Sequence, residues 1–229
     1  MKCVFVLILT IFLLSCQMLP VINSPVSAVN KNTLTCPSPF LKQKCRLVHS
    51  IENRMFGETQ SVIIGLTLVN PYTRVISCAI MTPEGMVLFE AESGPDTLKI
   101  NRALPPFDSE DFAKNVIEDI KLIFFAPEGI LHEKGTLADS TMVCRYQEEN
   151  DDWIDVIDDN LKGIAVKRYS PNGILKRHIK FNNKAGNIYQ NIELQAYETF
   201  NYSLLMNLIE AQKVEKKFPR AKHFRETKK

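Results

Sequence analysis

The residue types that carry out nucleophilic and acid-base chemistry are scattered along this chain. The four histidines lie far apart, and none of them stands in a recognised catalytic motif: His49, His132, His178 and His223. The G-x-S-x-G pattern that presents a serine nucleophile does not occur. No histidine therefore has a nucleophile and an orienting carboxylate at a recognisable spacing. The sequence predicts that the protein is not an enzyme.

Acidic residues gather in one stretch of the second half of the chain, where calcium is the ligand they could bind. The cluster comprises Glu148, Glu149, Asp151, Asp152, Asp155, Asp158 and Asp159. It lacks the glycine spacing of an EF-hand loop, so a solvated hairpin is the favoured interpretation. The cysteines form no C-x-x-C pair and have no histidine at ligand spacing, which makes a metal site the weaker alternative for them. We predict no metal and no cofactor.

The N-terminus has the pattern of an export signal. Lys2 precedes an apolar run from Cys3 to Leu14, which has the length of a signal-peptide core and is too short to span a bilayer. Leu13-Leu14-Ser15-Cys16 follows and resembles the bacterial lipobox, in which cleavage occurs before a cysteine that is then acylated, for example with palmitate. This pattern predicts a signal peptide over residues 1–15 and a membrane anchor on Cys16. The alternative is ordinary secretion, with cleavage after Val26-Ser27-Ala28.

Gln17 directly follows the expected lipid-bearing cysteine. Retention at the inner membrane depends mainly on Asp at this position, so the sequence favours the outer membrane, with the protein facing the periplasm. The net charge of +2 argues against a nucleic-acid partner. We expect a monomer whose only predicted partners are the membrane and the acyl chains of a lipid or lipoprotein.

Four cysteines remain after Cys16 in an oxidising compartment: Cys36, Cys45, Cys78 and Cys144. Four cysteines allow three sets of two disulfides. Cys36 and Cys45 are close in sequence, so we predict a local disulfide between them. Cys78 and Cys144 each stand in an apolar stretch and are predicted to be buried thiols or a cross-strand pair.

Most of the chain reads as short strands separated by turns, a pattern typical of an antiparallel meander. Residues 16–44 lack periodicity and are interpreted as a lipidated tether that holds the domain clear of the membrane. Residues 45–213 form the predicted domain, and residues 214–229 are a basic tail that we expect to be disordered. Strands are expected over residues 45–50, 61–69, 74–81, 86–91, 98–102, 141–146, 153–157, 164–169, 175–181, 188–197 and 202–209.

A single helix is predicted midway along this meander. Asp108 and Ser109 offer N-caps, and Phe112, Val116, Ile120 and Phe124 recur at helical spacing until Pro127. One amphipathic helix cannot cover a sheet of roughly ten strands, so the sheet should curl around it. The predicted class is mainly β (α+β), a curved antiparallel sheet or half-barrel with the helix as a lid.

The element order and the segment Met81-Thr82-Pro83-Glu84-Gly85-Met86-Val87-Leu88-Phe89-Glu90 between two strands resemble a family of bacterial outer-membrane lipoproteins of unknown function. That family is distantly similar to LolB, the receptor in lipoprotein localisation. The resemblance covers about residues 45–212 and implies a half-closed barrel with a helical lid over a cavity for acyl chains. LolB also carries an exposed hydrophobic residue on a loop between strands. Tyr72 is the only apolar candidate for it here, and its turn is tight.

The sequence therefore predicts an envelope lipoprotein that binds acyl chains in an apolar cavity, with a role in outer-membrane transport or assembly. The alternative is a structural or interaction lipoprotein with a closed core and no ligand. The expected wall and lid of the cavity share aliphatic or aromatic side chains on the predicted strands and helix: Ile64, Leu66, Leu68, Ile76, Ile80, Leu88, Phe112, Val116, Ile120, Phe124, Ile179, Phe181, Ile192, Leu194, Leu204 and Met206.

Overall fold

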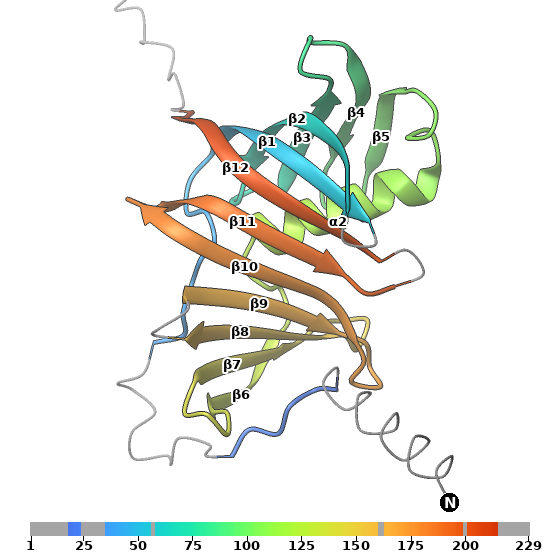
Figure 1. Cartoon of the computed structure of the whole chain (residues 1–229). Coiled ribbons are helices and arrows are strands. Elements are labelled where there is room, and N and C mark those ends of the chain that lie inside the picture. The colour runs from blue at the N-terminus through green and yellow to red at the C-terminus, as the bar shows by residue number, and fades with distance from the viewer. Residues whose placement is uncertain (1–17, 24–34, 56–57, 160–162, 199–200, 215–229) are drawn as a thin grey trace, which may run out of the picture.

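A computed structural model describes residues 18–23, 35–55, 58–159, 163–198 and 201–214 of the chain (Figure 1). The predicted signal peptide, Cys16 and nearly all of the basic tail lie outside these residues. Within the described part, no helix is both long enough and apolar enough to cross a bilayer.

One antiparallel sheet contains every strand of the described chain. Its first half runs β1 Cys45–Met55, β2 Glu58–Asn70, β3 Val75–Met81, β4 Val87–Ser93 and β5 Leu98–Ala103. Its second half runs β6 Ile130–Thr136, β7 Met142–Gln147, β8 Trp153–Asp159, β9 Gly163–Tyr169, β10 Leu175–Ala185, β11 Ile188–Ala196 and β12 Tyr202–Lys213. The strand order is β5-β4-β3-β2-β1-β12-β11-β10-β9-β8-β7-β6, so the first and last strands of the domain meet in the middle and the sheet stays open.

The helix α2, Glu110–Phe124, joins the two edges of this sheet and lies across one face of it (Figure 1). Ser109 is its N-cap and accepts a hydrogen bond from the backbone N–H of Phe112 at 3.1 Å. Glu110 and Asp111 stand in its first turn, where the helix dipole favours negative charge. The buried helical residues include Ile117, Ile120 and Phe124, as the apolar spacing predicts.

The predicted meander is confirmed, with twelve strands rather than about ten. The strand that the sequence failed to indicate is β6, which forms an edge of the sheet. Ile130 and Leu131 are exposed on it, while Gly135 is the buried position. The apolar residues of this strand therefore do not mark its buried side. Because its buried position is a glycine, β6 has no apolar alternation that the sequence could show.

The segment interpreted as a tether is packed on the domain wherever the structure describes it. Residues 18–23, called here the outer strap, lie along β6 to β9 on one face of the sheet, where Ile22 is buried with Val143 and Ile157. Residues 35–44, the inner segment, lie on the other face, where Phe40 and Leu41 join the main core. These residues therefore do not form a free tether.

The disulfide joins Cys36 to Cys144 of β7, which corrects the predicted pairing of Cys36 with Cys45. Pro37 and Pro39 stand between the two cysteines of the predicted pair, and the inner segment carries Cys36 across the sheet towards β7. Cys45 begins β1 in the middle of the sheet and is a buried free thiol, as is Cys78. The bridge fastens the inner segment to the second half of the sheet.

Candidate functional site

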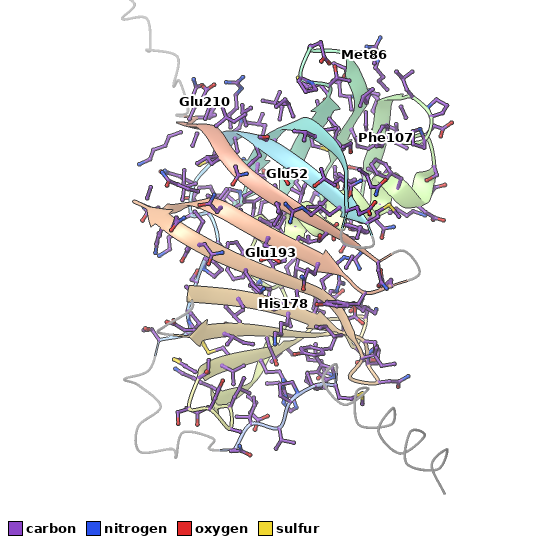
Figure 2. All side chains as sticks on the ribbon, in the orientation of Figure 1. Glu52, Met86, Phe107, His178, Glu193 and Glu210 are labelled. Carbon is purple, nitrogen blue, oxygen red and sulfur yellow. A yellow bond between two sulfur atoms is a disulfide. The ribbon has the colours of Figure 1, made fainter. Side chains whose placement is uncertain are left out.

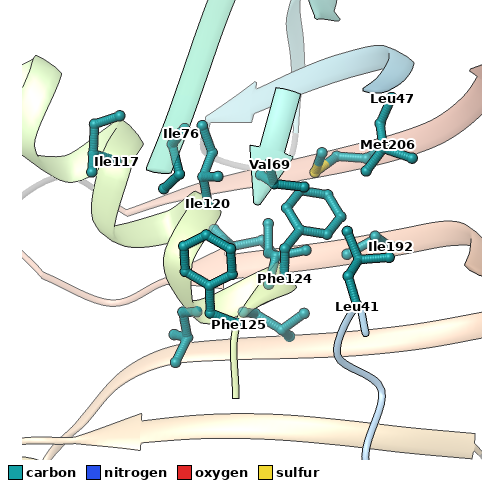
Figure 3. Packing of buried hydrophobic residues seen from close by; sticks show 14 of the residues in the cluster. Leu41, Leu47, Val69, Ile76, Ile117, Ile120, Phe124, Phe125, Ile192 and Met206 are labelled. Carbon is teal, nitrogen blue, oxygen red and sulfur yellow. The ribbon is translucent and has the colours of Figure 1, made fainter. Parts of the chain in front are cut away.

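The concave face of the sheet, which is the face under α2, carries the main apolar core. In Figure 3, Ile120 and Phe124 of α2 lie among Val69, Met206 and Ile192, which come from three different strands. Strand alternation places these side chains on one face. Leu41 of the inner segment reaches the same core, and its backbone N–H donates to the carbonyl of Phe124 at 3.0 Å.

Most of the residues predicted to form the wall and lid belong to this one cluster. They are Ile76, Ile80, Phe112, Val116, Ile120, Phe124, Ile179, Phe181, Ile192, Leu194, Leu204 and Met206. Their periodicity was a sufficient signal because each alternates with polar neighbours or repeats along one stripe of the helix.

Ile64, Leu66, Leu68 and Leu88 are exceptions, because they lie on the convex face. On β2 the concave positions are Ile63, Gly65, Thr67 and Val69, which pair with the core-facing residues of β1. The run from Val62 to Val69 carries apolar residues on both faces, so alternation alone could not assign the sides. Gly65 marks the concave side, since a Cβ built there would lie 2.6 Å from Cδ1 of Ile51.

The interior under α2 is filled in this structure. Ile179 and Leu194 have no exposed surface, and Phe181 retains only 1%. These side chains are shielded by one another and by the helix. An acyl chain can reach them only if α2 moves away from the sheet.

One flank of α2 is polar and is tied to the sheet by a buried ion pair. Nε of Arg177, on β10, donates to Oδ1 of Asp119 at 2.8 Å, and the hydroxyl of Tyr202 donates to Oδ2 of the same carboxylate at 2.5 Å. Arg177 also donates to Glu198 at 2.7 Å. Burial raises the pKa of Asp119 above its usual value, although Arg177 and Tyr202 act in the opposite direction.

A second group of charges continues this flank. Arg168 of β9 donates to Glu118 of the helix at 3.2 Å and to Asp152 at 2.9 Å. Lys176 donates to both oxygens of Asp152 at 3.0 and 3.1 Å. These residues line a hollow of about 360 Å³ beside the helix. The carboxylates and cations that line the hollow are already paired with each other. These ion pairs chiefly fix the position of α2.

Sequence reasoning found no charge inside the apolar runs, and Arg177 and Asp119 are the charges that it missed. Arg177 has the same strand parity as Ile179 and Phe181, which marks it as inward-facing. Asp119 stands three residues after Val116 and four before Ile123, within the apolar stripe of the helix. An opposite pair at core-facing positions was the available signal.

His49 is the other unexpected polar residue of the concave face. It is 1% exposed, and neither ring nitrogen has a hydrogen-bond partner within the described part of the chain. Its ring lies 6.1 Å from that of Phe124. Burial lowers the pKa of His49 to about 4, so the imidazole is neutral at neutral pH.

The remaining candidates for chemistry are dispersed. Asp152 and Asp155 of the acidic cluster each pair with an arginine, and the described residues contain no group of three or more potential ligands for a metal ion. His132 lies against Trp153, whereas His178 lies on β10 between two lysines, so the two histidines have separate environments. Tyr72 is 79% exposed in the turn between β2 and β3.

No known family model matches this sequence, and no curated protein is significantly similar to it. Among solved structures, a LolA superfamily protein from Nitrosomonas europaea matches with a TM-score of 0.51 at 11% identity, over 77% of this chain and 88% of that one. The fold is LolA-like. A putative outer membrane lipoprotein-sorting protein domain from Vibrio parahaemolyticus also matches, with a TM-score of 0.44 at 11% identity, over 76% of this chain and 88% of that one.

The LolA-like fold confirms the predicted class, a curved and unclosed antiparallel sheet with one helix across its concave face. At this level of identity the likeness concerns the fold.

Proposed function

We propose that this protein is an envelope lipoprotein that binds an acyl chain between α2 and the concave face of its sheet. The observation that carries the proposal is the way one helix closes the face. The hydrogen-bond ladder runs from β5 to β6 without α2, whose apolar stripe is packed on the strands by side chains. The helix can therefore leave without breaking a strand pair.

Displacement of α2 would uncover the aliphatic side chains of β10, β11 and β12, such as Ile179, Leu194 and Met206. Each methylene of a lipid that replaces the helix on this surface is stabilised by about 0.8 kcal/mol. The displacement must break the pairs of Arg177 with Asp119 and of Arg168 with Glu118. These pairs border the hollow beside the helix, so water can reach the separated charges.

The second part of the proposal is anchoring. Cys16, which lies outside the described residues, is acylated and holds the protein at the outer membrane, facing the periplasm. Support comes from Leu13-Leu14-Ser15-Cys16 and from Gln17. Cys16→Ser should abolish incorporation of labelled palmitate and leave unprocessed precursor. Persistence of labelled mature protein in this variant would refute the anchor.

Acyl binding is tested with a fluorescent fatty acid and the delipidated protein. Leu194→Glu places a charge on the concave face and should lower affinity at least tenfold. Leu66→Glu makes the same change on the convex face and should leave affinity unchanged. Unfolding in urea is measured for both, because a charge at Leu194 also destabilises the core.

A milder pair of variants separates lipid affinity from folding. Phe124→Ala removes a ring at the end of the helix, and Phe125→Ala removes the neighbouring ring of the same core, over which the guanidinium of Arg74 lies at 4.8 Å. Both side chains are buried, so both variants should lose stability. Because Phe124 belongs to the apolar stripe of the lid and Phe125 lies just beyond the helix, Phe124→Ala should change the affinity for the fatty acid more than Phe125→Ala does.

The filled interior supports a second candidate, an interaction lipoprotein with a closed core. Under this alternative the wild-type protein binds no acyl probe, and the amides of α2 are as protected from hydrogen exchange as those of the central strands. Probe binding together with faster exchange in α2 than in β1 would refute it.

A further inference from the structure

The outer strap is fastened to the convex face at both ends. The backbone N–H of Leu19 donates to the carbonyl of Gly173, in the turn between β9 and β10, at 2.7 Å. The N–H of Asn23 donates to the carbonyl of Thr136, at the end of β6, at 3.0 Å. Residues 18–23 therefore follow a defined path across this end of the sheet.

Side chains hold the middle of the strap. Ile22 is buried against Val143 and Ile157, which lie on the opposite face from the main core. Nη2 of Arg145 donates to the carbonyl of Pro20 at 2.9 Å, and the same guanidinium binds Asp155 in a buried ion pair at 2.7 and 2.8 Å. A strap with buried apolar and polar contacts is part of the domain.

Several large apolar side chains around the strap face outwards. Met18 is 59% exposed and pairs with Ile174, which is 54% exposed, while Val21 is 76% exposed. Ile130 of β6 is 80% exposed. It pairs with Gln147, which pairs with Trp153 on the next strand, so the three side chains lie on the same face. Trp153 is partly exposed and shares the convex face with Asp155 and Ile157.

We propose that this surface, defined by Met18, Val21, Ile130, Trp153 and Ile174 and called here the anchor face, rests on the lipid bilayer. The inference depends on the proposed acylation of Cys16. Only two residue steps separate Cys16 from Met18, a span of at most about 7 Å. An acylated Cys16 thus holds the strap, and with it this end of the sheet, at the lipid surface.

The composition of the anchor face fits the interfacial region of a membrane, where aliphatic side chains and tryptophan are stabilised. Exposed charges beside the anchor face indicate which lipid headgroups it would contact. Glu149 and Asp151 are exposed in the adjacent turn between β7 and β8. They would be repelled by anionic lipids, so contact should be strongest on zwitterionic lipid and should not weaken as salt is added.

Trp153 is the only tryptophan of the chain and reports this contact directly. The full chain is expressed, and the mature protein is checked for acylation by mass spectrometry. It is then reconstituted in phosphatidylcholine vesicles that contain phospholipid brominated near the top of the acyl chain. We expect at least twofold quenching of Trp153 fluorescence relative to vesicles without bromine.

Two variants should reduce this quenching. Inserting twenty Gly and Ser residues between Gln17 and Met18 lengthens the link to the lipid, and Val21→Glu with Ile174→Glu removes apolar contact. The matched control is Val62→Glu with Val75→Glu, which charges two exposed valines of β2 and β3 and should leave quenching unchanged.

Each outcome has a separate meaning. Acylated protein without quenching refutes the anchor face and leaves the lipoprotein proposal intact, whereas absence of the acyl group refutes both. Quenching that persists unchanged in the linker and glutamate variants also refutes the anchor face. Cross-linking of the anchor face to a second copy would show a dimer interface instead. Fatty-acid binding under α2 is a separate measurement, and its failure would not affect this result.

Discussion

The two halves of the sheet hold α2 by different means. Strands β1 to β5 contact the helix through apolar side chains, including Phe89, whose ring meets that of Phe112 edge-on at 5.3 Å. Strands β9 and β10 add the ion pairs of Arg168 and Arg177. The second half also carries the outer strap on its convex face and the Cys36–Cys144 disulfide.

The apolar contacts hold α2 on the sheet, whereas the ion pairs fix its position along the sheet. Burial of apolar area is favourable but has no direction, so the first half tolerates small shifts of the helix. Paired charges require a fixed geometry and fix the helix relative to β9 and β10. We expect α2 to loosen first over β4 and β5 (Figure 2 labels Phe107 at that end) and to remain longest at Arg177.

The largest expected effect follows from removing the charge that positions the helix. Arg177→Met leaves Asp119 buried without its cation, which should lower the free energy of unfolding by about 3–5 kcal/mol in urea denaturation. The double variant Arg177→Met, Asp119→Leu should recover most of this loss, since no charge remains unpaired. A double variant no more stable than Arg177→Met would show that the pair does not position the helix.

Loss of the disulfide between Cys36 and Cys144 should have the next largest effect on stability. Cys36 and Cys144 are separated by 108 residues, and the loss of such a bridge costs about 2–5 kcal/mol. Cys36→Ser should therefore lower the midpoint of urea unfolding, and dithiothreitol should lower the midpoint of the wild type to the same value. Cys78→Ser is the control, and reductant should still shift its midpoint by the wild-type amount.

The unpaired imidazole of the first half should make stability depend on pH. The pKa of His49 is lowered from 6.5 to about 4 in the folded state, so the unfolded state binds the proton first as pH falls below 6.5. Stability is therefore present above pH 6.5, and about 2 kcal/mol of it is lost between pH 7.5 and pH 5. His49→Leu should remove this loss.

His178 provides the comparison for that measurement. Its pKa is also lowered to about 4, mainly by burial and further by Lys167 and Lys180. His178→Gln should remove a similar part of the pH dependence, while the part due to His49 remains. If stability has the same pH dependence in His49→Leu as in the wild type, the imidazole is not held neutral by the core.

The sequence predicted the strands and the helix well because burial on one side leaves a periodic record. The predicted helix limits and those of α2 agree closely, as do most strand starts. It could not assign the faces of β2, where Leu66 and Leu68 are as apolar as Val69. The sequence also could not give the partner of Cys36. Cys45 is close to it in sequence, but the inner segment carries Cys36 to Cys144 on β7.

The candidate site was predicted as an apolar interior, and its polar flank was not. The strand parity of Arg177 places it on the buried side, but parity does not say which residue balances its charge. That partner, Asp119, lies 58 residues earlier on the helix. Parity and helical spacing mark each residue as core-facing, but no local pattern joins two residues so far apart, so their pairing and the positioning of α2 emerged only from the structure.

The smallest expected effect tests the apolar end of α2. Ser109→Ala removes the hydroxyl that accepts from the N–H of Phe112, which should cost about 1 kcal/mol of folding free energy. Ser109→Asp keeps an acceptor and a favourable charge at the helix N-terminus, so it should retain wild-type stability. If α2 loosens first over β4 and β5, hydrogen exchange in Ser109→Ala should quicken around Phe112 and Ala113 while the amides near Asp119 keep their protection. Equal acceleration along the whole helix would mean that α2 moves as one body, and the contrast between the two halves would then not govern its opening.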